Sequence, residues 1–143
     1  MEDKFKFGKM IELLQKAKAD LPTTLGEAGQ LYFQRNFNKA QWDGVAWAER
    51  KSKFTWVNHR KVLNTKHLLV KTGKLRQSLQ TSFRKGESNY KQIVWGTDIP
   101  YAKYQNEGTE TIPKRQFLGG SKELNDVLLK KIKFTFDKVM SGK

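Results

Sequence analysis

Apolar residues recur at helical spacing near both ends of the chain, and this pattern sets the main limit on its fold. Between residues 4 and 21, and again between residues 122 and 140, they return every three or four positions, as on one face of an amphipathic helix. Pro22 interrupts the first stretch, and Thr24 with Glu27 matches a capping box that begins another helix. We therefore expect two N-terminal helices and one long C-terminal helix.

The segment between these helices is predicted to contain β structure. Residues 80–85 and 90–96 have the pattern of two strands joined by a turn at residues 86–89, and the second strand is apolar on both faces, as in a central strand. Residues 54–57 have the pattern of a further short strand. The predicted fold class of residues 1–143 is a single α+β domain. In it, a small antiparallel sheet built on the central hairpin is packed by two N-terminal helices, short helices and a long C-terminal helix.

Single residues predict one turn and one short helix in the same region. Asp43 and Gly44 favour a turn between two tryptophans. Thr72 is a candidate N-cap for a short helix that carries Leu75 and Leu79 on one side. We expect both leucines to be buried.

A second short helix is predicted within residues 98–108. Asp98 is a candidate N-cap, Pro100 suits the first turn, and Gly108 ends the helix because glycine adopts the left-handed conformation at little cost. Tyr101 and Tyr104 are three residues apart and so share one face of this helix. We expect the two tyrosines to anchor it to the sheet.

Positive charge gathers in the middle third of the chain. The net charge is +14, and residues 50–91 hold twelve Lys/Arg but one Asp/Glu. Such a patch attracts a negatively charged partner but does not identify which kind of molecule it is. Both a nucleic acid and an acidic protein therefore stay open as partners. We expect a basic arm or long loop at about residues 50–67. The candidate interface or DNA-facing residues are Arg50, Lys51, Lys53, Trp56, Arg60, Lys61 and Lys114.

The sequence offers no set of residues for catalysis or metal binding. It has no cysteine, which excludes disulfides and thiolate sites, and no acidic residue lies between its two histidines, His59 and His67. Phosphate-binding glycine loops, HExxH and GxSxG are absent as well. We expect neither an enzyme nor a bound cofactor or metal. Since no apolar run approaches the roughly 20 residues that span a bilayer, we expect a soluble protein made in a cytoplasm, with no membrane partner.

Three motifs follow one another in the second half of the chain. They are LLVKTGKLRQSL from Leu68, VWGTDIPYAKYQNEGT from Val94 and IPKRQFLGGS from Ile112. In this order and at similar spacing, they resemble the phage virion morphogenesis family of tail completion proteins and the related head-tail joining proteins of tailed phages. The likeness covers about residues 25–130. The motif residues, to which the resemblance assigns structural roles, are Thr72, Gly73, Leu75, Gly96, Pro100, Tyr101, Gly108, Pro113, Arg115 and Phe117.

The resemblance implies a structural virion protein of a tailed phage or prophage, formed by one α+β tail-completion or head-tail joining domain. Such a protein completes the tail or joins head to tail at the neck as a homo-oligomeric ring. The implied partners are other copies of itself and other neck or tail proteins, in the virion and, during assembly, in the host cytoplasm. The arm and the loop at residues 109–114 are predicted to reach adjacent subunits. Non-specific contact with genomic DNA stays open, and the alternative is a basic nucleic-acid-binding protein that uses residues 50–91.

Overall fold

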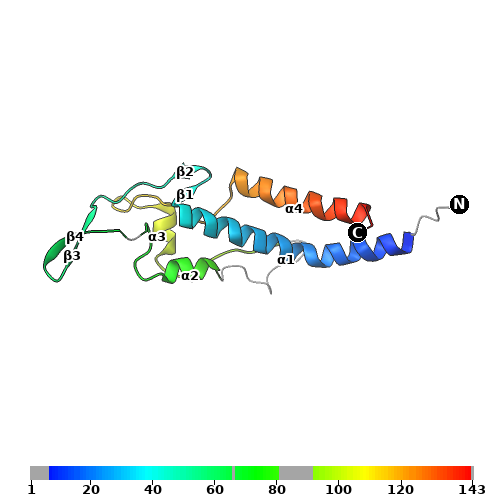
Figure 1. Cartoon of the computed structure of the whole chain (residues 1–143), viewed down its shortest axis with the longest axis horizontal. Helices are drawn as coiled ribbons and strands as arrows, with labels where there is room; N and C mark the ends of the chain where they lie inside the picture. The colour runs from blue at the N-terminus through cyan, green and yellow to red at the C-terminus, as the bar shows by residue number, and fades with distance from the viewer. Residues whose placement is uncertain (1–6, 66, 81–91, 143) are drawn as a thin grey trace.

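One long helix, α1 (Phe7–Lys39), follows much of the long axis of the molecule (Figure 1). The computed structural model describes residues 7–65, 67–80 and 92–142. The prediction of two N-terminal helices is wrong, because Pro22 lies buried inside this single helix. Thr24, the predicted cap, instead donates its hydroxyl to the Asp20 carbonyl at 3.2 Å. The packing of buried residues on this part of α1 outweighs the backbone hydrogen bond that proline removes.

The second long helix, α4 (Lys122–Met140), confirms the predicted C-terminal helix and packs antiparallel on α1 (Figure 1). It begins with a cap, since the Ser121 hydroxyl oxygen accepts the Leu124 N–H at 2.9 Å. The Tyr32 hydroxyl of α1 is hydrogen-bonded to the same Ser121 oxygen at 2.8 Å. Burial raises the pKa of Tyr32, so its hydroxyl stays protonated and donates to Glu123 at 3.3 Å. Polar contacts therefore fix the start of α4 on α1.

Aromatic rings form the core beside the C-terminal half of α1. Phe33 stacks on Trp42 with 6.0 Å between ring centroids, and Trp95 meets Phe33 edge-on at 5.8 Å. One turn further along α1, Phe37 packs edge-on against Trp47 at 5.4 Å. Pairs of this kind contribute roughly 0.5–1.5 kcal/mol each beyond the burial of their surface. Segments that are distant in sequence therefore meet on two neighbouring turns of one helix.

The strands form two separate two-stranded antiparallel sheets. One pairs β1 (Gln41–Trp42) with β2 (Val45–Ala46), and the other pairs β3 (Phe54–Val57) with β4 (Arg60–Leu63). The predicted turn at Asp43–Gly44 is confirmed, and both of its residues have the positive φ that a tight hairpin turn favours. The strand predicted at residues 54–57 is confirmed as β3.

The hairpin predicted over residues 80–96 lies largely on residues 81–91, outside the described part of the chain. Gln80, predicted as its first strand residue, is instead the last residue of a helix. The architecture that the described residues form is α+β: a long N-terminal helix, two small antiparallel sheets, short helices, and a long C-terminal helix that packs on the first.

The short helix α2 (Lys74–Gln80) confirms the prediction made from its leucines. Leu75 and Leu79 are both buried, and both belong to the core cluster beneath the helix. The predicted cap is wrong, because Gly73 rather than Thr72 directly precedes the first helical residue. Gly73 has a φ of 80°, a conformation that a residue with a Cβ rarely adopts.

The short helix α3 (Ala102–Glu107) ends as predicted but is oriented differently. Gly108 follows it with a φ of 79° and donates its N–H to the Tyr104 carbonyl. The helix begins after Tyr101, so Asp98 is not its N-cap. The predicted tyrosine anchors are wrong, since Tyr101 is 45% exposed and Tyr104 55% exposed. The first residue of α3 is buried in their place, because a small alanine lets the helix backbone approach the core closely.

Two glycines in α1 make a matched test of this packing. A Cβ on Gly29 would lie 2.4 Å from the Trp95 ring, whereas one on Gly8 would have nothing within 4 Å. Gly29→Ala should destabilise the protein by about 1–3 kcal/mol through overpacking. Gly8→Ala should leave stability unchanged or raise it slightly, by up to about 1 kcal/mol, through helix propensity. Urea unfolding followed by circular dichroism measures both, and equal effects of the two variants would contradict the packing.

Candidate functional site

The β3–β4 hairpin projects from one end of the body (Figure 1). All eight residues of its two strands are exposed. The register of the strands pairs Phe54 with Leu63 and Val57 with Arg60, and the Asn64 N–H donates to the Lys53 carbonyl at 2.8 Å where the hairpin begins. The arm or long loop predicted for this region is therefore an ordered hairpin that contributes no buried strand residue to the core.

The outward face of the hairpin combines aromatic, aliphatic and basic side chains. Because alternate strand residues share a face, Phe54 and Trp56 lie on the same side as Lys61 and Leu63 of the partner strand. Lys61 Nζ lies 4.7 Å from the centre of the Phe54 ring, which is a cation–π contact. Trp56 is 70% exposed. Large apolar side chains gathered on an exposed element are typical of a binding surface.

The structure brings most of the predicted cationic residues together at this hairpin. Arg60 and Lys61 lie on β4, and Lys53, directly before β3, forms an exposed ion pair with Glu49 at 3.8 Å. Such a pair is worth little in water, so Lys53 remains available to a partner. Arg50 donates to the His67 carbonyl at the hairpin base.

Lys51 connects this base with the loop after α3, and Lys114 lies in that loop. Lys51 Nζ lies 3.5 Å from the Thr111 carbonyl. Lys114 is exposed, and its backbone passes close to Gly108, where a Cβ would be 2.9 Å from the Lys114 nitrogen. The loop at residues 109–114 therefore lies beside the start of the arm rather than at its tip.

Arg115 holds the segment that leads into the hairpin. Its guanidinium is buried and donates from Nε to the Ala48 carbonyl at 2.9 Å and from Nη2 to the Glu49 carbonyl at 3.1 Å. Burial, followed by repulsion from Arg50, lowers the pKa of Arg115. A lysine has no planar fork to bind two carbonyls in this way. Arg115 is therefore a structural residue that positions the hairpin.

Three other motif residues also have structural positions. Phe117 is fully buried, and its N–H donates to the Asn106 side-chain oxygen at 2.9 Å. Gly108 ends α3, as described above, and Leu75 anchors α2 in the core. The remaining motif residues range from half-buried, as Gly73, Gly96 and Pro113 are, to exposed, as Thr72, Pro100 and Tyr101 are.

Sequence reasoning missed the second strand of the hairpin and the residues near its base. The sequence did contain a signal for β4, because Asn58 is a residue type that favours tight turns and the apolar pair Val62 and Leu63 follows it. In the structure the turn lies at Asn58–His59, and both residues have positive φ. The cavity behind the hairpin, which Lys71 and Gln105 help to line, left no local pattern because its walls come from separate segments.

The described residues form neither a metal site nor a membrane span. Within them, no group of three or more His, Cys, Asp or Glu residues lies close enough to hold a metal ion. None of the described helices is both long and apolar enough to cross a membrane.

Comparison of the chain with protein-family models, with curated proteins and with solved structures gives no match.

Two tryptophans test the separation between hairpin and core. Trp47 is 7% exposed and donates its indole N–H to the Gln116 carbonyl at 2.7 Å. Trp47→Ala should therefore cost about 3–5 kcal/mol of unfolding free energy. Trp56→Ala should change it by less than about 0.5 kcal/mol, because Trp56 lies outside the core. Urea unfolding gives both values, and a loss at Trp56 comparable to that at Trp47 would show that the hairpin packs on the body.

Proposed function

We propose that the chain is a structural virion protein of a tailed phage or prophage, which completes the tail or joins head to tail at the neck. The observation that carries the proposal is the projecting β3–β4 hairpin, whose outward face exposes Phe54, Trp56 and Leu63. An isolated hairpin with exposed apolar side chains is costly unless a partner covers it. The role is mechanical rather than enzymatic, and the protein acts in the virion after assembly in the host cytoplasm.

The three motifs support the same proposal through the positions of their residues. Arg115 and Phe117 of the third motif fix the segment before the hairpin and the core beneath it. Leu75 of the first motif packs in that same core cluster. Motif residues with such roles suit a family that keeps a scaffold constant while exposed elements meet different neighbours. A small antiparallel sheet built on a central hairpin that follows α2 also belongs to this proposal.

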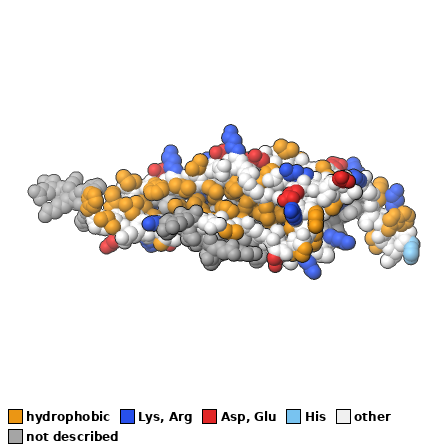
Figure 2. Space-filling model, turned by 180° about the vertical axis from the view of Figure 1, so that it is seen from behind, with side chains coloured by type: hydrophobic (Ala, Val, Ile, Leu, Met, Phe, Trp, Pro, Cys, Tyr) orange, Lys and Arg blue, Asp and Glu red, His pale blue; other side chains and the backbone are white. Residues whose placement is uncertain are grey.

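A homo-oligomeric ring is the assembly that the surface favours. A ring with heterologous contacts needs two different surfaces on each subunit. Figure 2 shows apolar side chains along the body as well as at the end formed by the hairpin. Phe7 and Ile11 of α1 and Phe134 and Met140 of α4 are exposed on the body. The hairpin of one subunit would contact the body of the next, and other neck or tail proteins would bind the ring.

Removing the hairpin tests the proposal directly. Deletion of residues 51–64 should leave helix content unchanged, since the strand residues it removes are all exposed and none of the residues buried in the core lies in this range. The product should sediment as a folded monomer and fail to restore infectious particles when supplied to a phage that lacks the gene. Normal virion assembly by this deletion variant would refute the proposal.

A nucleic-acid-binding protein that uses residues 50–91 is the second candidate. The Lys61–Phe54 contact favours it, because a cation beside an exposed ring suits phosphates and stacked bases. Within the neck proposal, the same residues would touch the genome non-specifically. Binding of this type weakens steeply between about 50 and 200 mM salt.

Two triple variants separate the candidates. Phe54→Ser, Trp56→Ser and Leu63→Ser together remove the apolar surface and keep every cation. Lys53→Ser, Arg60→Ser and Lys61→Ser together remove cations and keep the apolar surface. The assembly proposal predicts that the first set abolishes oligomerisation and the second weakens it less. The nucleic-acid candidate predicts a different result. Duplex-DNA binding would be lost only in the second set, and oligomerisation would be intact in both sets.

A further inference from the structure

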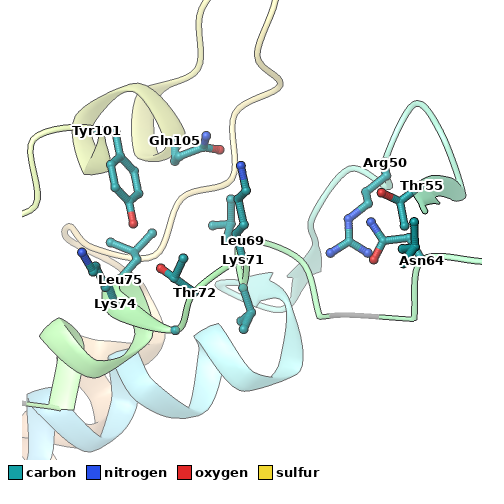
Figure 3. Close-up of a pocket in the computed structure, with 13 residues that line it drawn as sticks. Arg50, Thr55, Asn64, Leu69, Lys71, Thr72, Lys74, Leu75, Tyr101 and Gln105 are labelled. Carbon is teal, nitrogen blue, oxygen red and sulfur yellow. The ribbon is translucent and has the colours of Figure 1, made fainter. Parts of the chain in front are cut away.

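A cavity of about 820 Å³ lies behind the hairpin, on the side opposite its outward face. Thr55 and Val57 of β3 line it from the hairpin, and α2, α3 and the segment before α2 supply the other walls. Figure 3 shows Tyr101, which directly precedes α3, and Gln105 of α3 on one side, Lys74 and Leu75 of α2 below them, and Arg50 on the far side. The cavity is separate from the apolar surface to which the previous section assigns assembly.

The charged residues among the described walls of the cavity are all cations. Arg50, Lys71 and Lys74 line it, and none of the described lining residues is Asp or Glu. Arg115, a buried cation, feels Arg50 as a like charge, which adds to the effect of burial in lowering the pKa of Arg115. Three cations around one concave surface therefore lack a compensating anion among the described lining residues.

Aliphatic side chains complete the surface. Leu69 and Leu75 contribute to the lining, and Leu69 has a φ of 60°, a conformation that is uncommon for a leucine. Aliphatic surface fits an aliphatic side chain better than a nucleobase, which binds by stacking on aromatic rings. Among the lining residues that the structure describes, Tyr101 alone is aromatic.

We propose that this cavity binds a short, extended acidic segment of a partner protein. An aliphatic side chain of the segment lies against Leu69 and Leu75, and its carboxylates lie near Lys71, Lys74 and Arg50. The proposal goes beyond the assembly role of the hairpin and does not depend on it, because the cavity is complete within one subunit.

Fluorescence anisotropy with the purified full chain tests the proposal. The probe is a rhodamine-labelled library of short peptides in which a central Leu is flanked by Asp and Glu. A matched library carries Asn and Gln at the flanking positions. We expect the acidic library to bind at least about tenfold more tightly than the amide library. Equal binding of the two libraries would overturn the proposal.

Charge-reversal variants locate the binding. Lys71→Glu with Lys74→Glu should lower affinity for the acidic library by about tenfold or more. Lys103→Glu with Lys122→Glu changes the net charge equally on exposed residues that do not line the cavity, and should retain most of the affinity. Equal losses in the two double variants would mean non-specific attraction and would overturn the proposal.

A competition measurement completes the test. Unlabelled oligothymidylate competes for the same protein, and it should displace the acidic peptides poorly. Displacement by oligothymidylate at lower concentration than by unlabelled acidic peptide would identify a nucleic-acid site instead and overturn the proposal.

Discussion

The structure depends on aromatic contacts made by two neighbouring turns of α1. Phe33 binds the segments that carry Trp42 and Trp95, and Phe37 binds those that carry Trp47 and Phe117. Because the chain has no cysteine, packing of this kind must supply the stability that disulfides provide elsewhere. These rings meet on the C-terminal half of α1. They fix the path of the chain on both sides of the hairpin.

The consequence of this arrangement is a body that presents a hairpin without burying it. Trp47 and Arg115 secure the chain shortly before the hairpin, and Leu75 secures it afterwards. Between these points every strand residue is exposed. The hairpin therefore has two usable sides, an apolar and basic outward face and a concave, cationic inner side. The first suits a flat contact between subunits, and the second suits an extended segment.

The sequence predicted those parts of the fold whose signal is local. The bounds of α4, the turn at Asp43–Gly44 and the strand β3 follow from periodicity and turn residues, and the structure confirms them. The break at Pro22 was wrong because tertiary packing of α1 overrides the local preference. The tyrosine anchors of α3 were wrong because an alanine occupies the buried side of that helix.

The candidate site was predictable only in its charge and in its aromatic residues. Phe54 and Trp56 stand out in a basic stretch with Arg60 and Lys61, so the sequence predicts that the region meets a partner. The pairing of β3 with β4 decides which residues share a face, and it needs the whole hairpin. The cavity behind it joins Arg50, Lys71 and Gln105 from three separate segments, which no local pattern relates.

The central claim is that the hairpin is a contact element and not part of the core. Hydrogen–deuterium exchange with mass spectrometry tests it most directly, on the dilute monomer and on the assembled oligomer. The account predicts fast exchange of the amides in residues 54–63 in the monomer and strong protection after assembly, while residues 30–37 of α1 stay protected in both states. Identical protection of residues 54–63 in monomer and oligomer would contradict it.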